Sequence, residues 1–118
     1  MVDRYAIILT HNRPELLREC VEAIGPQVDH VIVIDNASSP PVSISNLPNG
    51  QARLFALYVP DQPPNLSRLW NLGLRQVEFI RDIHRLNRED PWYVAFLCDD
   101  AIAPPGWYDA VTTAMRDT

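Results

Sequence analysis

The chain has 118 residues, of which 47% are hydrophobic and 21% are charged, and its formal net charge is −5. This composition is typical of one globular domain with a core of its own, so residues 1–118 are expected to form a single domain. The acidic balance and the absence of a run of Lys or Arg argue against nucleic acid as a partner, because duplex binding draws on clustered cations.

Two cysteines, Cys20 and Cys98, are too few for a disulfide framework, and we interpret them as free thiols in a reducing compartment. No apolar run approaches the roughly 18 residues that a membrane span needs. The N-terminal segment has an apolar stretch of only five residues, 5–9, and no small-residue cleavage site, so it does not read as a signal peptide. The expected location is the cytoplasm.

Residues 5–9 form a continuous apolar run, which is typical of a strand buried on both faces. A helix is expected to begin just after Asn12, which is placed to cap it. Glu15 follows three residues later, as in a capping box. Gly25 and Pro26 are expected to end this helix.

Residues 30–34 predict a second buried strand, residues 37–48 a loop rich in Ser, Pro and Asn, and residues 53–59 a third strand. Asn65 is expected to cap a long amphipathic helix. The apolar stripe of that helix comprises Leu66, Leu69, Trp70, Leu74, Val77 and Ile80.

Residues 92–97 predict a fourth strand, followed by a short closing helix that runs through Met115. Strands of the buried type that alternate with helices predict an α/β fold with a parallel, doubly wound sheet. If the third strand lies outside the second, the strand order is 3-2-1-4. Ligands of such sheets bind beyond the carboxyl ends of the strands, where the strand order reverses.

Three of the predicted strands end in polar residues. They are Thr10 and His11 after the first strand, Asp35 and Asn36 after the second, and Asp99 and Asp100 after the fourth. Because the carboxyl ends of parallel strands share one edge of the sheet, these clusters are expected to meet around one crevice.

Adjacent carboxylates at a strand end suit a hard divalent cation, Mg²⁺ or Mn²⁺, which takes oxygen ligands. A solvated loop in which Asp99 or Asp100 caps the next turn remains the alternative. The segment that starts at Asp35 is also a good turn sequence in its own right. No glycine-rich phosphate loop follows the first strand, so phosphate binding would depend on a metal.

The segments THNRPELLRECVEAI, VIVIDNASS, PPNLSRLWNLGL and FLCDDAIAPPGW, in this order, resemble the nucleotide-sugar-binding half of family 2 glycosyltransferases with the GT-A fold. The rhamnosyltransferase-like branch is the most similar, and the resemblance spans essentially the whole chain. It implies a Rossmann-like, mainly parallel sheet. It also implies metal-dependent, inverting transfer from a UDP-, dTDP- or GDP-sugar to an unknown acceptor.

The resemblance also implies roles for individual residues. Asp100 matches the ligand of the Mg²⁺ or Mn²⁺ ion, and Asp99 lies near the ribose and assists the metal. His11 matches a residue that stacks on the base, and Asp35 matches the carboxylate that hydrogen-bonds the base. Thr10, Arg13, Arg68 and Asn71 are expected to line the nucleotide pocket.

The chain departs from the family pattern in two respects. Cys98 stands in place of the first acidic residue of the metal-binding triplet, and a neutral thiol is a poor ligand for Mg²⁺. No residue matches the general base, which belongs to the acceptor-binding half of the family. We therefore expect a donor-binding domain that lacks the acceptor half and transfers little or no sugar alone.

Two other functions stay open at this point. The first is a non-catalytic binding or assembly module that retains the GT-A fold. The second is a nucleotidyltransferase, which the turn at residues 10–14 disfavours because it is not glycine-rich. A sheet that ends at the fourth strand is expected to expose an apolar edge and to favour a homodimer.

Overall fold

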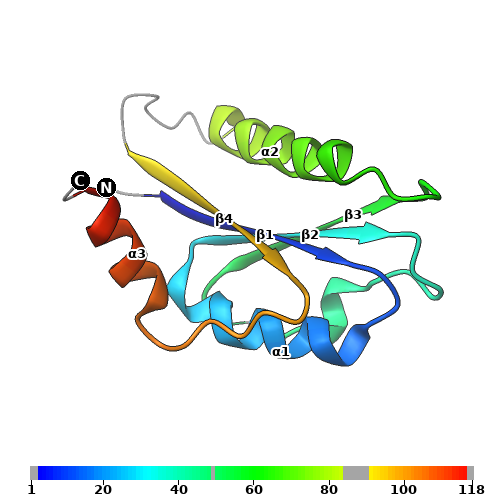
Figure 1. Cartoon of the computed structure of the whole chain (residues 1–118), viewed down its shortest axis with the longest axis horizontal. Helices are drawn as coiled ribbons and strands as arrows, with labels where there is room; N and C mark the ends of the chain where they lie inside the picture. Colours follow the sequence, from blue (N-terminus) through cyan, green and yellow to red (C-terminus); the bar gives the residue numbers. More distant parts are fainter. Residues whose placement is uncertain (1–2, 49, 84–90, 117–118) are drawn as a thin grey trace.

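The computed structural model describes residues 3–48, 50–83 and 91–116 (Figure 1). Within these ranges the chain forms four strands, three α-helices and two short 3₁₀ turns. The elements are β1 (Asp3–Thr10), α1 (Pro14–Ile24), η1 (Gly25–Gln27), β2 (His30–Asn36), η2 (Ile44–Asn46), β3 (Arg53–Val59), α2 (Leu66–Ile83), β4 (Trp92–Cys98) and α3 (Trp107–Arg116).

The four strands form one parallel sheet in the order β3-β2-β1-β4. The predicted α/β class, the parallel pairing and the strand order 3-2-1-4 are therefore confirmed. Thr10 at the end of β1 stands opposite Asp35 on β2, and Leu9 stands opposite Cys98 on β4. The strand order reverses between β1 and β4, so the crevice expected for a ligand lies beyond their carboxyl ends.

Helices cover both faces of the sheet, with α1 and α3 on one face and α2 on the other (Figure 1). Alternate residues of β1 enter different cores. Ala6 and Ile8 pack toward α1, whereas Tyr5 and Ile7 pack toward α2, and all four are 0% exposed. A strand buried on both faces cannot alternate apolar with polar residues, which explains its unbroken apolar sequence.

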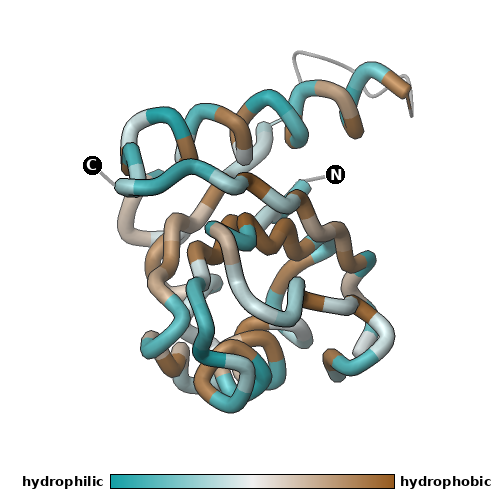
Figure 2. Tube along the Cα trace, turned by 90° about the vertical axis from the view of Figure 1, so that its right-hand side faces the viewer, coloured by the Kyte–Doolittle hydropathy of each residue, from teal (hydrophilic) through white to brown (hydrophobic). Residues whose placement is uncertain are grey.

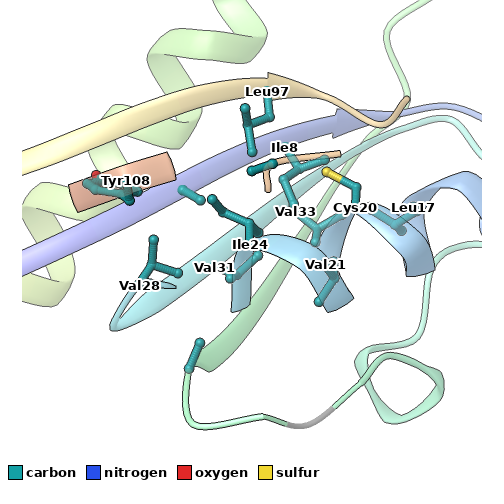
Figure 3. Packing of buried hydrophobic residues seen from close by; sticks show 13 residues of the cluster. Ile8, Leu17, Cys20, Val21, Ile24, Val28, Val31, Val33, Leu97 and Tyr108 are labelled. Carbon is teal, nitrogen blue, oxygen red and sulfur yellow. The ribbon is translucent and has the colours of Figure 1, made fainter. Parts of the chain in front are cut away.

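The core on the α1 side joins side chains from the sheet, α1 and α3 (Figure 3). Leu17, Val21 and Ile24 recur along α1 at helical spacing and point at the sheet. Tyr108 anchors α3, because its hydroxyl donates a hydrogen bond of 2.9 Å to the carbonyl oxygen of Tyr5. Burial is the main cause that raises the pKa of Tyr108, so this phenol stays a hydrogen-bond donor in the folded protein.

The predicted caps of the two long helices have different outcomes. Asn65 caps α2 as expected, because its Oδ1 accepts the backbone N–H of Arg68 at 3.1 Å. Asn12 does not cap α1. The residue that precedes α1 is Arg13, without a side-chain cap, and Asn12 has a left-handed φ of 52°. The side chain of Asn12 instead bonds the loop after β2, as described below.

The predicted stripe of α2 is correct in its centre, where Leu69, Val77 and Ile80 are buried, but not at Leu66, which is 59% exposed. Gly73 takes a central place in this stripe because α2 lies very close to β1. A Cβ atom at Gly73 would lie 2.7 Å from Cγ2 and 2.9 Å from Cδ1 of Ile7.

Gly73→Ala is therefore expected to lower the free energy of unfolding by about 1–3 kcal/mol, because Ile7 is fully buried and would have to shift. Urea denaturation of the variant measures this change. Gly25→Ala is the matched control, since a Cβ there meets no atom within 4 Å and Gly25 has a helical φ of −51°. Equal stabilities for the two variants would contradict the close approach of α2 to β1.

β4 is an edge strand of the sheet, and two of its aromatic side chains, Trp92 and Phe96, are 38% and 46% exposed. This is the apolar edge that the sequence leads us to expect, and the homodimer stays a prediction. Among the helices of the described ranges, none combines the length and the apolar character needed to cross a bilayer.

Candidate functional site

The connections after β1, β2, β3 and β4 gather at one end of the sheet. Figure 2 views the molecule from this end: the strands behind are largely hydrophobic, whereas the segments toward the viewer are mostly hydrophilic or neutral. We call this end of the sheet the carboxyl rim and define it by Thr10–Arg13, Asp35–Asn36, Asp61, Arg68 and Asp99–Asp100. Hydrogen bonds join its segments, as the sequence predicts for clusters that share one edge.

The ends of β1 and β4 are linked through Asp99. The hydroxyl of Thr10 donates a hydrogen bond of 3.0 Å to Oδ2 of Asp99, and Nη1 of Arg13 lies 3.4 Å from Oδ1. Asp99 is only 4% exposed, so it is not the solvated loop residue of the alternative reading. The polar contacts offset the loss of hydration of its buried carboxylate. Asp99 thus ties the ends of β1 and β4 together at the point where the strand order reverses.

Asp100, in contrast, is exposed. Within residues 3–48, 50–83 and 91–116, no group of three or more His, Cys, Asp or Glu side chains is placed to hold a metal ion. Both oxygens of Asp99 already have protein partners, so Asp100 is the carboxylate of the pair that remains accessible to a cation. Mg²⁺ often binds in this way, through one or two carboxylates together with water and substrate phosphates.

His11 is held in one orientation by its neighbours. Its Nδ1 donates to the carbonyl oxygen of Asn36, and its Nε2 lies 3.2 Å from Nδ2 of Asn12. The Oδ1 of Asn12 accepts the N–H of Ser39 at 2.8 Å, which turns its amide N–H₂ toward His11. The Nε2 of His11 then faces the amide N–H₂ of Asn12, while Nδ1 faces the carbonyl oxygen of Asn36. Stacking of His11 on a base stays a prediction.

A second chain of polar contacts runs from β2 to α2. The side-chain amide of Asn36, which is 5% exposed, donates to the carbonyl oxygens of Val59 and Asp61 at 3.1 and 2.9 Å. The carboxylate of Asp61 accepts from Nε of Arg68 at 2.9 Å. Arg68 therefore belongs to the carboxyl rim, and its contact with a nucleotide stays a prediction. Asn71 is exposed further along α2, and its side chain forms no hydrogen bond within the described part of the chain.

Asp35 is 1% exposed, and both of its carboxylate oxygens accept backbone N–H groups. Oδ1 accepts from Ser38 at 3.1 Å, and Oδ2 accepts from Val42 at 2.8 Å. These bonds hold residues 37–42 in a compact turn, so the turn role that the sequence leaves open for Asp35 is confirmed. A contact between Asp35 and a nucleotide base stays a prediction, and it would have to use the remaining lone pairs of the carboxylate.

The two cysteines are free, and they differ in environment: Cys20 is buried in α1 and Cys98 is exposed at the end of β4. Burial raises the pKa of the Cys20 thiol to about 12, and the nearby negative charges of Asp99 and Asp100 add to this shift. At pH 8 we therefore expect one thiol per native chain to react quickly with a small alkylating reagent and two after denaturation. Loss of the fast phase in Cys98→Ser checks the assignment, and fast reaction of both native thiols would contradict it.

Sequence reasoning missed Asn12, Ser38 and Asp61 as parts of this end of the molecule. The backbone N–H of Asn12 donates to Oγ of Ser38 at 2.9 Å, so the loops after β1 and β2 are fastened to each other. Asp61 lies just after β3, and its place after a strand is the one signal that indicates it. Nothing local in the sequence indicates the pairing of Asn12 with the loop after β2.

The fold and the carboxyl rim define a doubly wound parallel α/β domain with polar residues gathered at the carboxyl ends of the strands, where the strand order reverses. Comparisons of the chain with protein-family models, with curated proteins and with solved structures found no match.

Proposed function

We propose that this chain is the donor-binding domain of a family 2-like glycosyltransferase, which binds a nucleotide-diphosphate sugar together with Mg²⁺ or Mn²⁺. The observation that supports this function best is the arrangement of Asp99 and Asp100 at the end of β4. One carboxylate is buried and bound to Thr10 and Arg13, and its neighbour is exposed. A rigid base with one accessible carboxylate suits a cation that is shared with a ligand's phosphates.

Individual residues of the carboxyl rim would have separate roles in binding the donor. The side chain of Arg13 is 57% exposed, so its guanidinium can leave or share Asp99 and donate two hydrogen bonds to the oxygens of a phosphate. Asp100 would hold the divalent cation, which neutralises charge on the diphosphate when bound. His11 offers a flat ring whose orientation is fixed by Asn36 and Asn12. The proposal assigns no general base, and sugar transfer by this chain alone is expected to be negligible.

Calorimetric titration with UDP, GDP and dTDP, with and without Mn²⁺, tests this function. We expect binding of at least one nucleotide to strengthen when Mn²⁺ is present. Asp100→Asn is expected to weaken the metal-dependent binding by at least about tenfold. Glu78→Gln removes the same charge from an exposed site on α2 and is the matched control. Equal metal dependence in both variants would exclude Asp100 as the ligand.

One observation favours the second candidate function, a non-catalytic binding or assembly module. The carboxylates of Asp35 and Asp99 are nearly inaccessible and are used to hold the protein's own segments together. Cys98 also replaces an acidic residue beside them. The absence of any heat with the three nucleotides in the presence of Mn²⁺ would favour this module over a donor-binding domain.

A further inference from the structure

A cavity of about 360 Å³ lies between the N-terminal half of α1 and the loop after β2. Ligand pockets in proteins commonly fall in the range of about 300–1,000 Å³. One wall is formed by Leu17 and Arg18 of α1, and the opposite wall by residues 38–43, Asn46 and Leu47. We call it the α1–loop cavity.

The walls of the α1–loop cavity combine apolar surface with hydrogen-bonding edges. Leu17 is buried, and Val42 and Leu47 pack against the same core from the loop side. Ser43 and Asn46 add polar atoms to this lining. A flat heterocycle with polar edges matches such a surface better than a purely apolar or a purely charged molecule does.

The charges at the α1–loop cavity favour an anion, although the whole chain is acidic. Arg13 and Arg18 line it, against one carboxylate, Glu15. Arg18 is exposed and forms no ion pair within the described ranges. A ligand with a negative group at one end would therefore find a cation, Arg18, that no carboxylate of the described residues occupies.

The α1–loop cavity adjoins the acidic end of β4 through two shared residues. Thr10 and Arg13 line the cavity, and the same side chains contact the two oxygens of Asp99. A ligand that extends past Arg13 would therefore reach Asp99 and Asp100 without leaving the protein surface. Asp35 does not line the cavity but holds its wall through Ser38 and Val42.

We propose that the nucleoside part of the donor occupies the α1–loop cavity, and that its diphosphate passes Arg13 toward Asp100. This inference rests on the proposed function and names the subsite for the base. It differs from the family resemblance, which assigns the base to His11 and Asp35. In the structure, Asp35 acts as a positioning residue that shapes the wall of the cavity, because its carboxylate fixes the loop before any ligand arrives.

A blocking substitution at the mouth of the cavity tests this placement. Ser43 is exposed and lines the cavity, so Ser43→Trp fills part of the cavity without disturbing the core. We expect it to weaken UDP binding by at least about tenfold, as loss of a well-packed contact does. Ser45→Trp is the matched control, since Ser45 is exposed in the same loop but does not line the cavity, and its affinity is expected to stay unchanged.

NMR spectroscopy of the native chain locates the bound nucleotide directly and does not depend on the folding of the variants. Uridine and UDP are titrated into the ¹⁵N-labelled native chain with Mn²⁺ replaced by Mg²⁺, and the amide signals are followed. Shifts at Leu17, Val42 and Leu47 are expected from both probes. Shifts confined to His11 and Asn36, or full affinity for UDP in Ser43→Trp, would overturn the inference and leave the proposed function standing. A native chain that binds no nucleotide would overturn both.

Discussion

Arg81→Met is expected to lower the free energy of unfolding by about 3–5 kcal/mol. Nη1 of Arg81 lies 3.0 Å from Oδ2 of Asp3, and the two side chains are only 8% and 14% exposed. The guanidinium also stacks over the ring of Trp92, 5.2 Å from its centroid. Methionine keeps most of the aliphatic stem but leaves the Asp3 carboxylate buried without its cation, and that uncompensated charge causes the loss.

Urea denaturation of native and variant chains measures this effect. The matched control is Arg68→Met, which breaks an ion pair with Asp61 whose side chains are 50% and 29% exposed. An exposed pair of this kind contributes about 0–1 kcal/mol. Equal losses of unfolding free energy in the two variants would contradict the conclusion that a buried ion pair matters more for stability than an exposed one. Adding Asp3→Asn to Arg81→Met is expected to recover part of the stability, because it removes the buried charge.

The sheet could be predicted because each strand can be recognised from its own short stretch of sequence. Residues 5–9 and 31–34 are unbroken apolar runs, and a strand covered on both faces by helices requires such a run. The right-handed crossover between parallel strands then leaves few strand orders to consider. The structure has the order 3-2-1-4, which the sequence predicts on the condition that the third strand lies outside the second. The polar rim is a consequence of that order, since parallel strands end on the same side.

The connections after β1 and β2 could not be predicted in the same way. Asn12 looks like a helix cap, because it stands just before Pro14 and three residues before Glu15. Its side chain prefers a partner 27 residues away, the N–H of Ser39. A cap and a loop contact compete for the same amide group, and only the folded arrangement of the two loops decides between them.

No local feature of the sequence indicates the ion pair of Arg81 and Asp3 either. Arg81 falls in the polar part of the sequence pattern of α2, yet it is 7% exposed because Trp92 and Asp3 cover it. Its burial depends on β4 lying beside β1, which brings residues 3 and 92 into register. The burial of a charged residue at such a junction can be recognised only once the strand order of the sheet is known.

Asp35→Ala is expected to lower the free energy of unfolding by about 3 kcal/mol and to loosen residues 37–42. The carboxylate accepts two backbone N–H groups, and each hydrogen bond to a charged group contributes about 1.5–3 kcal/mol. Asp35 is 1% exposed, so water does not easily replace it as the acceptor for Ser38. Ser43→Ala is the control, since its exposed hydroxyl bonds only Ser45 and its loss is expected to change stability little.

Amide hydrogen exchange separates this positioning role of Asp35 from direct contact with a base. If the carboxylate holds the loop, the amides of Ser38 and Val42 exchange at least about tenfold faster in Asp35→Ala than in the native chain, with no nucleotide present. The affinity for UDP then falls together with this loss of protection, because the wall of the α1–loop cavity is no longer fixed. If Asp35 instead serves only to bind the base, UDP affinity falls while both amides keep their native protection. That second outcome would remove the reason for placing the nucleoside beside α1.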